Sequence, residues 1–317
     1  MKIKFDSQQQ YQLDAVSAVV DIFDGQPQDT QDFTSYIIEK SLPLFKDLPL
    51  TTPGIGNQLL LSSEKLRENV RKIQERNEID TPDPAADLES WPILGPNNEF
   101  QRYCYHFSVE METGTGKTYV YLRTIFDLSK RYGFKKFIIV VPSIAIREGV
   151  LKNIEITAEH FRALYNNVEF EWFEYDAKKI TRLRQFAVSN TIQVLVINID
   201  AFRKNFTGTE EENKSNVIYK ENDRFHGKPI EFVQSVNPIV IIDEPQSVDN
   251  TDKAQEAIKA LNPLCTLRYS ATHTNPYNII YRLDPIRAFE LKLVKQIVVG
   301  SSVATGHMNA AFVGGKY

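Results

Sequence analysis

A glycine-rich run that ends in lysine and threonine carries the strongest chemical signal. Residues 111–118 read Met-Glu-Thr-Gly-Thr-Gly-Lys-Thr, between a β-rich run and a helix-like run at 119–132. Glycines let backbone N–H groups turn toward phosphate oxygens, and the helix N-terminus adds partial positive charge. The pattern predicts an ATP-binding loop, although Met111 stands where the strict pattern has glycine. The nucleotide-binding residues would be Thr113, Gly114, Thr115, Gly116, Lys117 and Thr118.

Two adjacent acids follow an apolar run and supply the complementary chemistry. The run 240–242 leads directly into Asp243 and Glu244. In an open α/β sheet, ligands bind beyond the carboxyl ends of the strands. We expect Thr118 and Asp243 to hold Mg²⁺, Lys117 to reach the β- and γ-phosphates, and Glu244 to polarise the attacking water. Lys117, Asp243 and Glu244 are therefore the predicted catalytic residues, converging at one sheet edge.

The elements that must position these residues alternate along the chain. Short β-rich runs interleave with helical ones, which predicts a parallel sheet with helices on both faces, the α/β fold of a P-loop NTPase. The β-rich runs are 105–111, 137–141, 170–175, 192–199, 239–242 and 267–270, with a last strand-like stretch at 291–299. We expect four units: an N-terminal helix at 1–27, a helical accessory insertion at 28–100, the ATP-binding domain at 101–290 and a linker start at 291–317.

Composition narrows the class of protein. The 317 residues have a net charge of −4, two cysteines without metal-like spacing and 42% hydrophobic residues. No signal pattern or membrane-length apolar run is present, so we expect a cytoplasmic protein with no membrane partner. Any nucleic-acid contact must come from a local basic surface. We expect the basic runs Lys135-Lys136 and 178–184 to be solvated faces rather than that surface.

Further motifs, in order, produce a family resemblance. Around the loop and the acids lie Tyr-Gln-Leu-Asp-Ala-Val at 11–16, Val-Val-Pro-Ser at 140–143, Asp-Glu-Pro-Gln at 243–246 and Ser-Ala-Thr at 270–272. Together they resemble superfamily 2 helicases, and most closely the Res subunit of type III restriction-modification enzymes. The resemblance covers about residues 8–272, is weak over 28–96, and implies a RecA-like motor domain.

This resemblance implies residue roles position by position. Gln12 matches a glutamine that reads adenine, and Gln246 matches a sensor of nucleotide state. Ser270 and Thr272 match a motif that couples phosphate state to domain movement. The segment that touches a nucleic-acid backbone is matched by Pro142, Ser143 and Arg147, and a second such motif would lie at 198–202. Each of these could instead be an ordinary helix, loop or strand-end residue.

The resemblance also implies partners and a reaction. These are ATP with Mg²⁺, double-stranded DNA, and a DNA-methyltransferase (modification) subunit, in a site-specific restriction endonuclease. A second motor domain and a nuclease domain would lie beyond this chain, so we expect the chain alone to bind nucleotide weakly and hydrolyse it slowly. Alternatives are another superfamily 2 DNA or RNA helicase domain, a non-catalytic nucleotide-binding module, and a small-molecule kinase, which would not explain the Ser-Ala-Thr motif.

Overall fold

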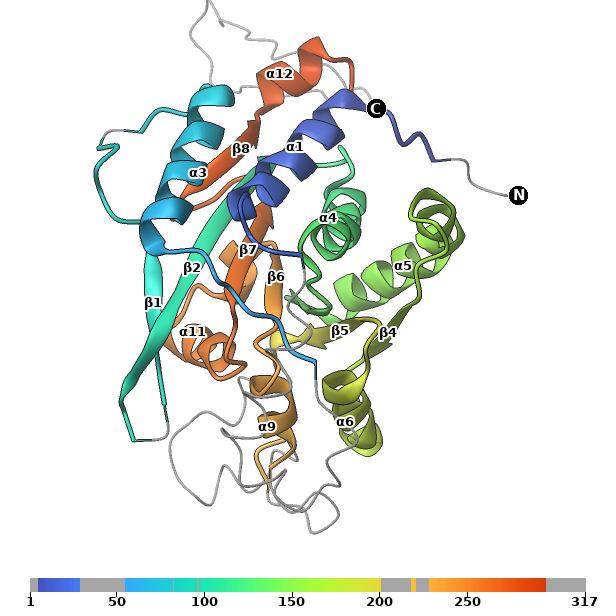
Figure 1. Cartoon of the computed structure of the whole chain (residues 1–317). Coiled ribbons are helices and arrows are strands. Elements are labelled where there is room, and N and C mark those ends of the chain that lie inside the picture. The colour runs from blue at the N-terminus through green and yellow to red at the C-terminus, as the bar shows by residue number, and fades with distance from the viewer. Residues whose placement is uncertain are drawn as a thin grey trace, which may run out of the picture.

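The strands join one sheet of eight strands, seven of them in the order β1-β2-β7-β6-β3-β5-β4, with β8 also paired to β2 (Figure 1). The computed structural model describes residues 5–28, 55–81, 83–95, 97–200, 218–220 and 228–294. All strand pairs are parallel except β1 with β2. The strands are β1 Ser90–Leu94, β2 Phe100–Met111, β3 Lys136–Val141, β4 Phe170–Glu174, β5 Ile192–Asn198, β6 Ile239–Asp243, β7 Cys265–Ser270 and β8 Ile279–Leu283.

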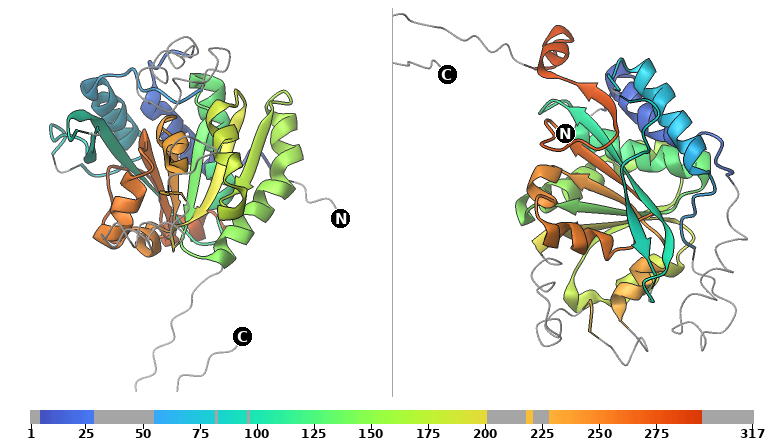
Figure 2. Two further views of the ribbon diagram at one scale, coloured as in Figure 1. Left: turned by 90° about the horizontal axis from the view of Figure 1, so that it is seen from below. Right: turned by 90° about the vertical axis from the view of Figure 1, so that its left-hand side faces the viewer.

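Helices cover both faces of this sheet (Figure 2). Along β3, Phe137 and Ile139 enter one core and Ile138 and Val140 the other, because successive side chains of a strand point to opposite faces. The first core is completed by α1 (Gln10–Val20), η1 (Asp21–Phe23), α3 (Ser63–Arg76), α4 (Lys117–Tyr132) and α5 (Ile144–Leu164). The second is completed by α6 (Thr181–Val188), α9 (Pro229–Gln234) and α11 (Asp252–Lys259).

Three short helices complete the described elements: η3 (Ala177–Lys179), α10 (Pro245–Val248) and α12 (Pro285–Glu290). The α/β fold class predicted from alternating strands and helices is confirmed. It has a mostly parallel sheet because nearly all connections between paired strands pass through helices or long loops. The single antiparallel strand, β1, lies at the sheet edge and contains Pro92, which is tolerated there because an edge strand leaves N–H positions unpaired.

The described part of 28–100, where we expected a helical accessory insertion, contributes strand β1 to the sheet and helix α3 to the first core. Strand β1 pairs with the first half of β2, which itself begins at Phe100, before the expected boundary. Helix α3 packs in the first core, and two side-chain amides, one from α3 and one from the residue that follows it, donate to carbonyls of β8. Gln74 Nε2 donates to the Ile279 carbonyl at 2.8 Å and Asn77 Nδ2 to the Ile280 carbonyl at 2.6 Å.

One expected solvated lysine is instead fully buried. Lys136 is 0% exposed at the start of β3, and its ammonium donates to the carbonyls of Phe186 at 2.6 Å and Ser189 at 2.5 Å. The prediction that Lys135 and Lys136 form a solvated face is therefore wrong for Lys136. Charge alone did not reveal that the α6 C-terminus presents two carbonyls at this point.

At the C-terminal end, residues 291–294 form a turn rather than the start of the expected strand, and 295–299 lie outside the described residues. The second nucleic-acid motif expected at 198–202 is likewise described only as far as Asp200. None of the described helices is both long and apolar enough to cross a membrane.

Candidate functional site

The glycine-rich loop connects strand β2 to α4. Gly114 and Gly116 have φ angles of +82° and +91°, a left-handed conformation that a residue with a Cβ rarely adopts. At Gly116 an added Cβ would also come within 2.6 Å of the Gln12 side-chain nitrogen. The loop is closed by Thr115, whose hydroxyl donates to the Glu112 carbonyl at 2.6 Å, while the Thr113 N–H donates to the Glu112 carboxylate at 2.8 Å.

Helix α1 lies against this loop. Gln12 Nε2 and the Tyr11 hydroxyl each donate to the Thr115 carbonyl at 3.1 Å. The helix is held there by the Arg123 guanidinium, which donates to the Ser7 carbonyl at 2.6 Å, and by the Tyr281 hydroxyl, which donates to the Tyr11 carbonyl at 2.8 Å. Gln12, predicted from the resemblance alone, thus lies beside the loop and is only 8% exposed.

The acids lie at the same sheet edge as the loop. Strand pairing places Asp243 beside Tyr269 and Ser270 beside Glu110, so β6, β7 and β2 end nearly level. Lys117 Nζ lies 3.2 Å from Glu244 Oε1 and donates to the Met111 carbonyl at 3.3 Å. The structure therefore places the loop lysine in contact with the second acid. From the sequence, we expected the loop and the acids to be close only because they follow strands of one sheet.

The backbone at Glu244 has φ +56° and ψ +66°, which is uncommon for a residue other than glycine. Its N–H donates to the Tyr269 carbonyl at 2.9 Å, and α10 begins at the next residue with Pro245. Such a conformation costs about 1–3 kcal/mol and often occurs at functional sites. Here it turns Glu244 back toward Lys117 while Asp243 stays 7% exposed on the strand.

The two acids have opposite electrostatic environments. Burial raises the pKa of Asp243 to about 6, the nearby Glu244 charge adds to this, and Lys117 partly opposes it. Burial would also raise the pKa of Glu244, but hydrogen bonds from Gln246, Lys117 and Ser270 outweigh it and hold that pKa below its usual value. Glu244 is thus the acid that its neighbours hold ionised.

A hydrogen-bond network joins Glu244 to β7. Gln246 Nε2 donates to Glu244 Oε2 at 2.6 Å, and Ser270 Oγ lies 3.0 Å from the same oxygen. The Ser270 hydroxyl is also 2.8 Å from Gln246 Oε1 and 2.7 Å from the Thr272 carbonyl, and it accepts from the Thr272 N–H at 3.3 Å. One hydroxyl proton can serve only one of these acceptors at a time, so the network has alternative arrangements.

The residues expected to touch nucleic acid lie after β3, away from the loop contacts. Ser143 caps α5, its hydroxyl accepting from the Ile146 N–H at 3.3 Å, and Pro142 precedes it. Arg147 pairs with Glu148 at 2.8 Å and with Glu174 of β4 at 3.2 Å. The Arg147 guanidinium is therefore engaged by two carboxylates rather than by a residue of the loop.

Two features near the site were missed by sequence reasoning. Tyr121, one helical turn after Lys117, is 0% exposed and its hydroxyl lies 3.4 Å from Asp243 Oδ2. Arg268 of β7 is 1% exposed and forms a buried ion pair with Asp249, just after α10. The spacing of four residues from Lys117 could have indicated Tyr121, whereas no pattern marks Asp249 as a partner of Arg268.

The donor set fits a magnesium ion better than a zinc ion. Thr118 and Asp243 offer a hydroxyl and a carboxylate, hard oxygen ligands that Mg²⁺ uses together with water and substrate phosphates. Among the described residues there is no group of three or more histidine, cysteine, aspartate or glutamate side chains that could hold a metal by itself.

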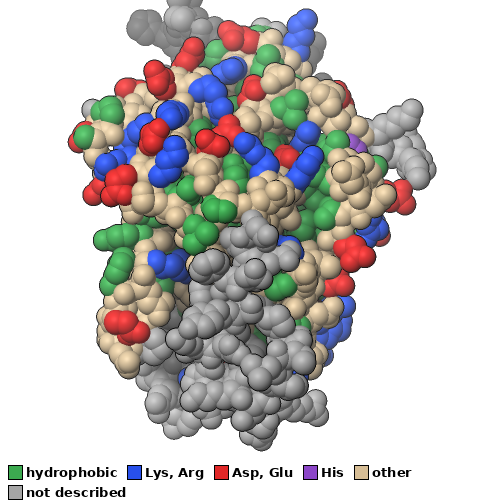
Figure 3. Space-filling model, in the orientation of Figure 1, with side chains coloured by type: hydrophobic (Ala, Val, Ile, Leu, Met, Phe, Trp, Pro, Cys, Tyr) green, Lys and Arg blue, Asp and Glu red, His purple; other side chains and the backbone are tan. Residues whose placement is uncertain are grey.

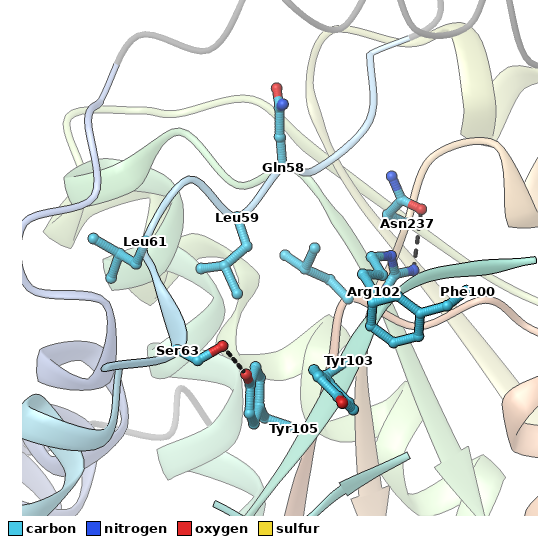
Figure 4. Close-up of a pocket in the computed structure, with 10 residues that line it drawn as sticks. Gln58, Leu59, Leu61, Ser63, Phe100, Arg102, Tyr103, Tyr105 and Asn237 are labelled. Carbon is cyan, nitrogen blue, oxygen red and sulfur yellow. Dashed lines mark hydrogen bonds between the residues drawn. The ribbon is translucent and has the colours of Figure 1, made fainter. Parts of the chain in front are cut away.

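A hollow lies at the other end of β2. It has a volume of about 450 Å³ and is lined by residues that include Phe100, Tyr103 and Tyr105 (Figure 4). Its one cation, Arg102, is already engaged, donating to the Pro263 carbonyl at 2.6 Å and to Asn262 Oδ1 at 2.7 Å.

On the described surface shown in Figure 3, basic and acidic side chains are intermixed and do not form separate positive and negative patches.

Comparisons with known proteins find several that are similar to this chain. The profile of the family described as "Type III restriction enzyme, res subunit" matches residues 65–275. The Res subunit of the type III restriction-modification enzyme EcoPI, from Escherichia phage P1, is 33% identical over 77% of this chain and 25% of that subunit. The EcoP15I Res subunit of Escherichia coli is 31% identical over 76% of this chain and 24% of that subunit.

The chain thus spans about a quarter of the length of the curated relatives it matches. Among solved structures, the Sulfolobus solfataricus SWI2/SNF2 ATPase core in complex with dsDNA is 12% identical, over 65% of this chain and 31% of that one, with a TM-score of 0.33.

Proposed function

Because the chain belongs to the family of type III restriction enzyme Res subunits, we propose that it binds ATP with Mg²⁺ at the loop and hydrolyses it as the first motor domain of a DNA-dependent translocase. The observation that carries this proposal is the 3.2 Å approach of Lys117 Nζ to Glu244 Oε1, which joins the phosphate loop to the acid pair. A glycine-rich turn without a phosphate-binding role would not need its lysine to contact an acid on another strand.

The residues divide the chemistry between them. The loop N–H groups and Lys117 would bind the β- and γ-phosphates, with Lys117 exchanging its contact with Glu244 for one with phosphate. Thr118 and Asp243 would hold Mg²⁺, which when bound neutralises charge that develops on the phosphates. Gln12 would contact the adenine from α1, where it already borders the loop at Thr115.

Glu244 would accept the proton of, or orient, the attacking water. Its pKa is held low, and Gln246 and Ser270 fix its Oε2, which leaves Oε1 to face the phosphate side with Lys117. The Ser270 hydroxyl can change acceptor between Glu244, Gln246 and Thr272. A change in the state of the nucleotide at Glu244 would therefore alter the hydrogen bonds at the end of β7. This is the coupling role proposed for Gln246, Ser270 and Thr272.

The proposal extends to macromolecular partners. Pro142, Ser143 and Arg147 would contact the backbone of double-stranded DNA, and a DNA-methyltransferase subunit would supply sequence recognition. For Arg147 this requires exchange of Glu174 for a phosphate, so duplex DNA binding should weaken in Arg147→Ala and strengthen in Glu174→Gln. Equal DNA affinity of both variants and the unaltered chain, measured by fluorescence anisotropy, would remove Arg147 from the interface.

The central test of the hydrolytic role is Glu244→Gln. We expect this variant to bind ATP as the unaltered chain does, while phosphate release falls by about 10²-fold or more, within the range of general-base effects. Glu155→Gln is the matched control, because Glu155 is 62% exposed on α5 and pairs only with Lys152 among the described residues. Undiminished phosphate release by Glu244→Gln would refute the assignment of Glu244.

A further inference from the structure

Tyr121 occupies a buried position between the loop helix and the acid strand. It lies three residues after Thr118 in α4 and is 0% exposed. Its ring packs edge-on against Tyr269 of β7, with ring centroids 5.5 Å apart. The Tyr269 carbonyl in turn accepts the Glu244 N–H at 2.9 Å. The phenol is therefore fixed by packing on the elements that carry Thr118, Asp243 and Glu244.

The Tyr121 hydroxyl contacts one of the two residues assigned to Mg²⁺. It lies 3.4 Å from Asp243 Oδ2, to which it donates. Burial, followed by the nearby Asp243 charge, raises the pKa of Tyr121 well above its usual value. The phenol is thus a neutral group with one proton to donate and lone pairs to accept.

We propose that Tyr121 is a positioning residue for the Mg²⁺ site, orienting the carboxylate of Asp243 so that its free lone pairs face the metal. By donating to Oδ2, it fixes the rotation of the Asp243 carboxylate. This inference rests on the proposed function, because it assumes that nucleotide and Mg²⁺ bind at this edge.

The chemistry explains why a tyrosine suits this position. A neutral donor that binds one carboxylate oxygen holds the carboxylate in one rotation and leaves the other oxygen free for a metal. Groups that orient metal ligands in this way typically contribute about 10–100-fold to metal affinity. A phenylalanine would fill the same volume between α4 and β7 and would not supply the hydrogen bond to Asp243.

The experiment measures binding rather than turnover. A fluorescent ATP analogue is titrated against the 317-residue chain in EDTA and at increasing Mg²⁺, which separates nucleotide affinity from the Mg²⁺ concentration that gives half of the metal-dependent gain. For Tyr121→Phe we expect unchanged affinity in EDTA and about a tenfold higher half-effect Mg²⁺ concentration. Tyr132→Phe is the control, because Tyr132 is also buried in α4 and its hydroxyl has no partner among the described residues.

The outcomes are distinct. A half-effect Mg²⁺ concentration equal to that of the unaltered chain, or an equal loss of affinity in EDTA and in Mg²⁺, overturns the role of Tyr121. If the unaltered chain shows no Mg²⁺-dependent nucleotide binding, the proposed function itself fails. Tyr121→Met gives a second variant without a hydroxyl if Tyr121→Phe does not fold, as judged by circular dichroism.

Discussion

Replacement of Asp249 by leucine removes one partner of the ion pair behind the acid strand. The Asp249 and Arg268 side chains are only 9% and 2% exposed. Without the carboxylate, the Arg268 guanidinium retains one hydrogen bond, from Nε to Thr266 Oγ1 at 3.3 Å, and contacts with the Tyr277 and Trp91 rings at 4.5 and 5.5 Å. Its Nη2 has no partner among the described residues even with Asp249 present.

The magnitude follows from burial. Breaking a buried pair by removing one partner costs about 3–5 kcal/mol, because the other charge stays out of water without compensation. For a domain of this size, about 2 °C of melting temperature corresponds to each kcal/mol. We therefore expect Asp249→Leu to lower the melting temperature by roughly 6–10 °C. Combining it with Arg268→Met should restore most of this loss, since no charge then stays buried.

Scanning calorimetry of the single and double variants provides the assay. Asp21→Asn is the matched control, because Asp21 pairs with two arginines, Arg76 and Arg131, but its side chain is 26% exposed and theirs 47% and 46%. Such surface pairs contribute about 0–1 kcal/mol each, so this variant should melt within a few degrees of the unaltered chain. Equal losses for Asp249→Leu and Asp21→Asn, or a double variant less stable than Asp249→Leu, would refute the reasoning.

Two further substitutions test the loop and the buried lysine. Gly116→Ala should reduce affinity for an ATP analogue, because the φ of +91° at Gly116 and the nearby Gln12 amide exclude a Cβ. Gly149→Ala, at an exposed position of α5, should leave that affinity intact and raise stability by about 0.5–1 kcal/mol. The opposite pattern in binding and melting assays would contradict the loop geometry. Burial lowers the pKa of Lys136 to about 7 from 10.5, so the unfolded chain binds more protons between those values and the melting temperature should rise from pH 7 toward pH 10. Lys136→Met should flatten that rise, and an unchanged pH dependence would show that Lys136 does not cause it.

Sequence patterns were most informative where apolar periodicity and fold class coincide. Each strand predicted between 105 and 270 is present, because runs such as 239–242 are apolar throughout and must be covered on both faces. Strand β1 was missed because Pro92 argues against a strand, and β8 because Arg282 interrupts its apolar pattern. Both add to β2 through tertiary pairing that local propensity does not encode.

The candidate site divides in the same way. The loop and the acid pair were visible because their chemistry requires particular residue types in fixed order. Other features depend on how α4 and β7 pack: the Lys117–Glu244 contact, the left-handed backbone at Glu244 and the position of the Tyr121 hydroxyl. The spacing of residues along the sequence does not predict distances between separate elements. The burial of Lys136 was not predicted for the same reason, because its carbonyl partners lie at the end of α6.

Nucleotide binding at the loop is tested most directly by the dissociation constant of ATP with Mg²⁺. We would measure it by isothermal titration calorimetry for the unaltered chain and for Lys117→Ala. A hydrogen bond to a charged group contributes about 1.5–3 kcal/mol, so we predict about 10–100-fold weaker binding for Lys117→Ala and no change for the exposed Lys152→Ala on α5. Equal affinity of Lys117→Ala and the unaltered chain would contradict the proposed ATP site, because the lysine that contacts Glu244 would then not bind phosphate.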